Sequence, residues 1–207
     1  MAKREKIVTP KGKFIFPKLH EPDYKFKEMG EYSVKLRLSG EEAESFRNDL
    51  QSHLDDWLAR YKKENKKKPK AVDLSVTEVL DDEGNETGEL DFKFAMPANI
   101  RTKAGKEYSL EPKLFDSKGK PIPKGTQVWG GTVGRVAFWI KEYEAPIGVG
   151  ISCKLEAAQI VELVGPGEQS ADQFGFGEEE GYEAPDSGPE PVEEEVDVDT
   201  EDDDVDF

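Results

Sequence analysis

The sequence predicts a mainly β domain, an antiparallel barrel with one long inserted α-helix, followed by a disordered acidic C-terminal tail. Three observations predict this fold class. Apolar residues recur at steps of three and four in one segment, they alternate with polar residues in several others, and every basic residue lies before residue 165. The first pattern is typical of a helix and the second of half-buried strands.

Charge divides the 207-residue chain into two parts. The 29 Lys and Arg residues all lie in residues 1–164 with 27 of the 45 acidic residues, so this part has a net charge of +2. Residues 165–207 hold the other 18 acidic residues, no basic residue and few apolar ones. Such a segment cannot bury enough apolar surface to offset its ordering entropy. We therefore expect a domain over 1–164 and a disordered tail over 165–207.

The helix is predicted between Leu36 and Pro69. Its apolar positions, at three- and four-residue steps, are Ala43, Phe46, Leu50, Leu54, Trp57 and Tyr61. Glutamates gather in the first turn and lysines follow the last one, which suits the helix dipole. Pro69 then stops the helix because proline cannot continue it.

Alternation with a period of two predicts the strands. It is clear in Tyr32–Leu38, Leu90–Met96 and Val133–Tyr143, and residues Val149–Val164 are apolar enough for one long bent strand or two consecutive ones. Turn residues separate these segments. One helix among five or more strands fits a small antiparallel barrel, of which the OB-fold is the best-known nucleic-acid-binding form. A β-sandwich is the competing architecture.

Several classes of protein fit the composition poorly. The single cysteine, Cys153, cannot form an internal disulfide, which favours a reducing compartment such as the cytoplasm. No apolar run reaches the length of about 18 residues that spans a bilayer, and no signal peptide is recognisable. The two histidines, His20 and His53, have no partner at metal-ligand spacing. We therefore expect no catalytic residue, metal, cofactor or membrane contact.

The strand predicted over Val133–Tyr143 gives the strongest indication of function. Alternation buries Phe138 and turns a second set of side chains to the other face. That set is Arg135, Trp139, Lys141 and Tyr143. Cations beside flat rings suit single-stranded nucleic acid, because the cations pair with phosphates while the rings stack on bases. In the alternative interpretation the helix covers this face and Trp139 belongs to the core.

Further cations would extend this face into a basic groove if their strands are neighbours. They are Lys35 and Arg37 on one strand, Lys93 on another, and Arg101, Lys103 and Lys106 in the turn that follows. Scattered surface lysines have the same appearance in a sequence, so the groove hypothesis needs several of them together.

The tail ends in an acidic run followed by Phe207. A solubilising polyanion gains nothing from a terminal aromatic, whereas a Phe side chain beside an α-carboxylate is a compact ligand for a pocket with a basic rim. We expect this end of the tail to bind partner proteins and the tail to compete with DNA for the basic groove. The residues concerned are Asp202, Asp203, Asp204, Asp206 and Phe207.

Several short motifs occur in an order that resembles a known family. They are Thr9-Pro10-Lys11-Gly12-Lys13, Tyr32-Ser33-Val34-Lys35-Leu36, Phe92-Lys93-Phe94, Phe115-Asp116-Ser117-Lys118-Gly119-Lys120-Pro121, Gly148-Val149-Gly150-Ile151-Ser152-Cys153-Lys154-Leu155 and the terminal Asp206-Phe207. With the amphipathic helix between the second and third, the chain is similar to the single-stranded-DNA-binding proteins of tailed bacteriophages. These proteins combine one OB-fold with an acidic tail that ends in an aromatic residue.

The resemblance implies binding of replicating and recombining DNA, strand annealing, and tail contacts with the DNA polymerase and the helicase or primase. Tyr143, Arg101 and Lys103 match positions that contribute to the DNA cleft in that family, whereas Pro97 replaces an aromatic that relatives can carry. Some members form homodimers through their tails.

The sequence thus predicts a non-catalytic protein that binds single-stranded DNA in the host cytoplasm during phage DNA replication, recombination and repair. Lys93, Arg101, Lys103 and Arg135 would contact phosphates, with Lys35 and Arg37 in the same groove, while Trp139 and Tyr143 would stack on bases. The main alternative is a DNA-mimic or inhibitor protein that acts through its acidic tail. A metal-dependent nuclease ranks third.

Overall fold

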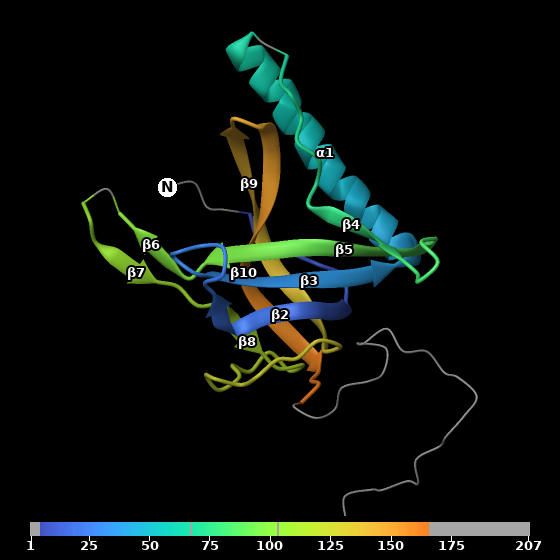
Figure 1. Cartoon of the computed structure of the whole chain (residues 1–207), viewed down its shortest axis with the longest axis vertical. Coiled ribbons are helices and arrows are strands. Elements are labelled where there is room, and N and C mark those ends of the chain that lie inside the picture. Colours follow the sequence, from blue (N-terminus) through green and yellow to red (C-terminus); the bar gives the residue numbers. More distant parts are fainter. Residues whose placement is uncertain (1–4, 67, 103, 166–207) are drawn as a thin grey trace, which may run out of the picture. The chain divides into compact units, whose positions relative to one another are not determined.

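The structure is a computed structural model of the chain, and it describes residues 5–66, 68–102 and 104–165 (Figure 1). The described part holds one helix, α1 (Gly40–Asn65), and ten strands. The strands are β1 (Ile7–Val8), β2 (Gly12–Asp23), β3 (Glu31–Ser39), β4 (Val76–Leu80), β5 (Glu86–Pro97), β6 (Asn99–Arg101), β7 (Glu107–Ser109), β8 (Lys113–Phe115), β9 (Val133–Ala145) and β10 (Gly148–Glu162).

Five of these strands close into a barrel. β2 pairs with β3, β3 with β5, β5 with β10, β10 with β9, and β9 again with β2. Among these five pairings, only β5–β10 is parallel. The inward side chains of the two central strands are almost fully buried: Val34, Leu36, Phe92 and Phe94. This closed sheet has the architecture of the OB-fold, so the predicted barrel is confirmed and the β-sandwich is wrong.

Helix α1 packs its apolar stripe against the interior of the barrel. Phe46 meets the rings of Phe92 and Phe138 edge to face, with ring centroids 4.9 and 5.9 Å apart. Leu50 and Leu54, one and two turns further along, are also buried. The predicted helix is confirmed. Its apolar residues recur at three- and four-residue steps, which puts them on one face, and this face completes the core.

The second half of α1 packs along the β9–β10 hairpin, which extends beside the helix (Figure 1). Arg60 forms an ion pair with Glu142, and the hydroxyl of Tyr61 donates a hydrogen bond to Glu144 at 2.7 Å. The helix therefore occupies the side of the hairpin on which the even-numbered residues of β9 lie. The odd-numbered residues face the opposite side.

The segment that the sequence left open as one or two strands is the single strand β10. Its pairing with β9 is irregular between Leu155 and Ala157 and again between Ile160 and Glu162. The predicted tail, apart from Gly165, lies outside the described residues. Within the described part, α1 lacks the apolar length that crossing a bilayer requires.

Candidate nucleic-acid interface

Strands β3 and β5 bring lysines together on the outer face of the barrel. Lys35 lies directly opposite Lys93 in the antiparallel register, and both side chains point away from the buried Val34 and Phe94. Cross-strand neighbours of this kind have Cβ atoms only about 5 Å apart, and like charges there repel one another. The carboxylate of Glu31 lies 3.6 Å from the ammonium group of Lys93 and offsets part of this repulsion, and a bound anion would offset the rest.

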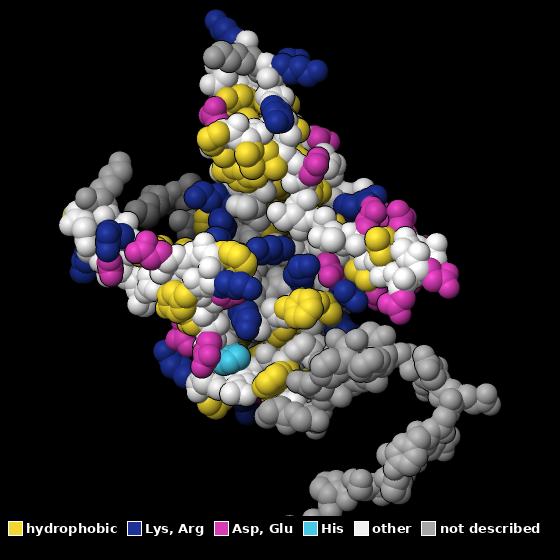
Figure 2. All heavy atoms as spheres, in the orientation of Figure 1, with side chains coloured by type: hydrophobic (Ala, Val, Ile, Leu, Met, Phe, Trp, Pro, Cys, Tyr) yellow, Lys and Arg dark blue, Asp and Glu magenta, His cyan; other side chains and the backbone are white. Residues whose placement is uncertain are grey.

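The lysine row continues onto β10 and β9. Lys154 is aligned with Ala95 of β5 on one side and with Trp139 of β9 on the other. Lys141 of β9 follows, opposite Ser152. In Figure 2, basic side chains gather in the middle of this face, with hydrophobic side chains around them. We call Lys35, Lys93, Lys141, Lys154 and Trp139 the basic face.

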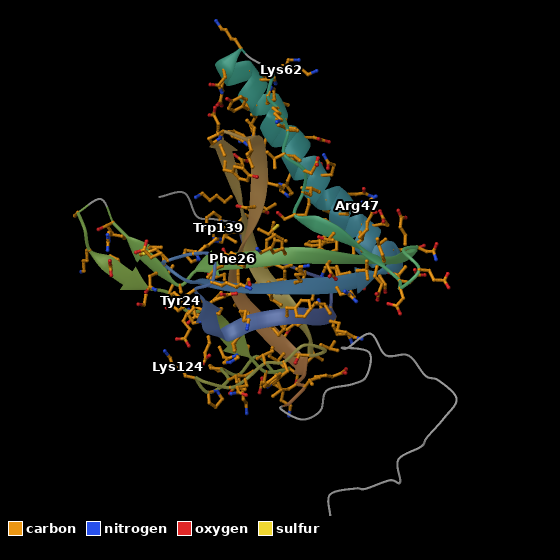
Figure 3. The ribbon with its side chains drawn as sticks, viewed as in Figure 1. Tyr24, Phe26, Arg47, Lys62, Lys124 and Trp139 are labelled. Atoms are coloured by element: carbon orange, nitrogen blue, oxygen red, sulfur yellow. The ribbon has the colours of Figure 1, made fainter. Side chains whose placement is uncertain are left out.

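The segment between β2 and β3, residues 24–30, adds aromatic rings to the basic face. The ring of Phe26 is 85% exposed, and the ammonium group of Lys25 lies 5.2 Å from its centroid. Tyr24 rests on Gly30, where a Cβ atom would come within 2.7 Å of its ring. Figure 3 shows Tyr24, Phe26 and Trp139 over the same sheet. Exposed aromatics of this size beside cations usually have a binding role.

Burial, and after it the crowding of positive charge, lowers the pKa values of two lysines here. Burial and the neighbouring Lys141 and Lys93 lower the pKa of Lys154 below its ordinary 10.5. Burial lowers the pKa of Lys27 as well, and Lys93 and Lys154 add to that effect. These mutual effects place Lys27 near the lysines of two strands, Lys93 of β5 and Lys154 of β10. A bound phosphate would relieve the repulsion, because a negative charge favours the protonated form of lysine.

The structure brings some predicted site residues together. Lys35, Lys93 and Trp139 lie on the basic face. Tyr143 lies on the same side of β9 and rests against its cross-strand partner Gly150, where a Cβ atom would be 2.9 Å from the Tyr143 Cζ atom.

Other predicted residues have different surroundings. Arg37 donates two hydrogen bonds to Asp91, at 2.8 and 3.1 Å, which raise the pKa of its guanidinium and occupy its charge. Arg101 is paired in the same way with Glu107 across the β6–β7 hairpin. Lys103 and the tail residues Asp202, Asp203, Asp204, Asp206 and Phe207 lie outside the described residues.

Arg135 is separated from the basic face. It lines a groove between β1 and α1 whose rim includes Glu42, Asp49 and Asp56. Arg135 and Trp139 both lie at odd-numbered positions of β9, but between them β9 pairs irregularly with β10. Near Arg135 it lies close to β1 and β2, and from Trp139 onward it pairs with β10 alone. Trp139 lies on the odd-numbered side of β9, away from the helix, and is half-buried.

Sequence reasoning missed Tyr24, Phe26, Lys27 and Lys154 as candidate site residues. A signal for the first three was present, because Tyr24-Lys25-Phe26-Lys27 alternates aromatic and basic residues between Pro22 and Gly30. Lys154 had no such signal, because its importance depends on which strands lie beside β10.

Comparison with solved structures shows the same architecture in phage proteins. The gp2.5 single-stranded-DNA-binding protein of bacteriophage T7 superimposes with a TM-score of 0.68 at 21% identity, over 88% of this chain and all of gp2.5. The single-stranded-DNA-binding protein of bacteriophage Enc34, solved in complex with ssDNA, matches with a TM-score of 0.57 at 12% identity, over 78% of this chain and 89% of its own. The chain shares the fold of these phage proteins.

No protein-family model matches the sequence, and no curated relative matches it. The structural likeness agrees with the OB-fold that the sequence resemblance implied. OB-folds bind oligonucleotides on the face of their second and third strands, with help from the loops between strands one and two and between strands four and five. In this barrel those parts are β3, β5, residues 24–30 and the tip of the β9–β10 hairpin. They coincide with the basic face and its aromatic rim.

Proposed function

We propose that this chain is a single-stranded-DNA-binding protein that holds the strand on its basic face and performs no chemistry on it. The observation that carries the proposal is the continuous row of Lys35, Lys93 and Lys154 beside exposed rings, on the part of the barrel that OB-folds use. The two phage proteins with this fold are themselves named as single-stranded-DNA-binding proteins.

Binding would combine phosphate contacts with base stacking. The lysines of the basic face follow the phosphates, while Phe26, Tyr24 and Trp139 offer flat surfaces to bases. Stacking does not need a particular base, since every base has a π-face, and each stack contributes about 1–3 kcal/mol. Weak sequence preference is the expected consequence.

The biological role that we propose is in phage DNA replication, recombination and repair, inside the host cell. The acidic tail would compete with DNA for the basic face and, when DNA displaces it, bind replication proteins such as the polymerase and the helicase or primase. The support is the charge division of the chain, +2 before residue 165 and 18 acidic residues after it.

Fluorescence anisotropy with labelled oligo-dT tests the proposed function. We expect binding that prefers single strands over a duplex of the same length. If about four phosphates are neutralised, log affinity should fall against log salt with a slope near about −3. A slope near zero, or equal affinity for the duplex, would contradict this mechanism.

The tail requires its own comparison in the same assay. Removal of residues 182–207 should tighten binding at low salt, and the gain should shrink at high salt because screening weakens the competition. Equal affinity of the full and shortened chains at low salt would remove the competition from the proposal.

A third prediction concerns alkaline pH. The lowered pKa values of Lys154 and Lys27 mean that the free protein loses these two charges below pH 10.5, while bound DNA favours their retention. DNA affinity should therefore fall as pH rises through the lowered pKa values of these two lysines. Lys154→Arg should reduce the fall, because a guanidinium stays charged over this range. Anisotropy titrations between pH 7 and 10 check this.

Over the same pH window the folded chain holds fewer protons on these two groups than the unfolded chain. Their contribution to the free energy of unfolding should therefore rise with pH. A loss of DNA affinity without a loss of stability would show that the alkaline effect acts on binding and not on the fold.

A further inference from the structure

A bulge in β2 holds the aromatic ring of Phe16 in solvent. Ile15 pairs with Lys35 and Lys18 pairs with Ser33, so Phe16 and Pro17 form an irregularity in the register. Phe16 has a φ of 47°, in the left-handed region that non-glycine residues rarely adopt, and its side chain is 76% exposed. An aromatic residue that is both strained and exposed gains little stability there, and such positions concentrate at functional sites.

Beside Phe16 lies a cavity of about 720 Å³. A second aromatic residue, Trp129, lines it from the segment before β9. The buried indole Nε1 of Trp129 has no hydrogen-bond partner among the described residues. Because that N–H is buried, Trp129 offers the cavity the surface of its ring and not a hydrogen-bond donor.

Basic side chains flank Phe16 on both sides. Lys13 and Lys18 line the cavity, and within the described part neither has an acidic partner within 4.0 Å. Arg37 lines the cavity too, but its charge is occupied by Asp91 and Glu89. The charge offered to a ligand is therefore that of two lysines, one before and one after the exposed ring in the sequence.

The cavity is continuous with the basic face. Ile15, which lines it, is directly opposite Lys35, and Lys35 is opposite Lys93. Only the spacing between neighbouring strands, about 4.8 Å, separates the edge of the cavity from the lysine pair. A DNA strand that crosses β5 and then β3 would next reach β2.

We propose that this cavity is a second stacking subsite for the same DNA strand, a proposal that rests on the proposed function. Phe16 stacks on one base, and Lys13 and Lys18 pair with the phosphates on its two sides. A nucleotide in a chain carries a phosphate on each side of its base, which matches lysines on both sides of a ring. The aromatic side chain of Trp129 forms part of the cavity wall beside this base.

The test uses full-length protein and an oligo-dT series from about 4 to about 20 nucleotides, a range that covers the known site sizes of one OB-fold. Phe16→Asn removes the ring, and asparagine tolerates the left-handed backbone. We expect this variant to bind the longer oligonucleotides about 5- to 150-fold more weakly, the range of one stacked base. The shortest ones, held on the basic face alone, should be bound as by the unmodified protein. Phe16→Trp, which keeps a ring, should bind the longer ones normally.

Three results would overturn the subsite, each in a distinguishable way. If the unmodified protein binds no oligonucleotide, the proposed function fails and the subsite fails with it. If Phe16→Asn matches the unmodified protein at every length, the function stands and the subsite does not exist. If Phe16→Asn binds DNA more tightly at low salt, the cavity holds the acidic tail and not a base.

Discussion

Replacement of both Lys35 and Lys93 by alanine should weaken the binding of single-stranded DNA by more than about a hundredfold. These lysines face each other on the central strands of the basic face, and no other pair in the described part occupies the same position. A hydrogen bond to a charged group contributes about 1.5 kcal/mol at the lower end of its range, so two such contacts contribute about 3 kcal/mol. The salt slope should become less steep by about 1.4, because two phosphates are no longer neutralised.

Lys118→Ala with Lys120→Ala is the matched control for this variant. These two lysines are exposed in the turn after β8, and the double change removes the same net charge. We expect the control to bind nearly as the unmodified chain does. If both double variants lose affinity equally, binding depends on net charge and not on a face of the barrel. Anisotropy at several salt concentrations separates these outcomes.

Phe46→Ala should reduce the free energy of unfolding by about 3–5 kcal/mol, the usual cost of truncating a buried aromatic. Phe46 is 6% exposed, and its ring packs against Phe92 and Phe94 of β5 and Phe138 of β9, three side chains from two strands of the barrel. Its loss leaves a cavity between helix and barrel that the surrounding strands cannot close without breaking their register. Urea unfolding followed by circular dichroism measures the change.

Phe26→Ala is the exposed counterpart of Phe46→Ala, and it is tested both by urea unfolding and by the anisotropy assay of DNA binding. Its ring is 85% exposed, so the free energy of unfolding should stay within about 0.5 kcal/mol of the unmodified value. DNA affinity should fall by the contribution of one stacked base, about 1–3 kcal/mol. Unchanged DNA affinity would remove Phe26 from the interface, and a large loss of stability would show that the loop is part of the core.

The packing of Phe46 shows why the fold could be predicted from the sequence. The positions of Phe46, Leu50 and Leu54 repeat with the period of a helix, and this repetition is visible within a few turns of chain. The alternation in β3 and β5 is equally local, so the burial of Val34 and Phe94 followed from it. Helix and strand patterns depend on neighbours in the sequence, because the backbone geometry that creates them repeats every few residues.

The candidate site could be predicted only in part. Lys35 and Lys93 were identified because both alternate outward, but their pairing depended on β3 and β5 being neighbours. Arg37 also alternates outward, yet Asp91 on the neighbouring strand takes its charge. Whether an outward cation is available to DNA depends on what the adjacent strand places opposite it, which the sequence of one strand does not contain.

By itself, the sequence determined four of the five barrel strands (β3, β5, β9 and β10, but not β2), the helix, the division of charge and the outward position of most cations. The tertiary structure alone decided that Lys154 lies between Ala95 of β5 and Trp139 of β9, that Arg135 lines a groove with acidic side chains, and that Phe16 is held in solvent by a bulge. The physical reason is the difference in sequence separation between local patterns and tertiary contacts. Periodicity reports which face a residue occupies, whereas barrel closure and register, which join segments far apart in the chain, decide which faces meet.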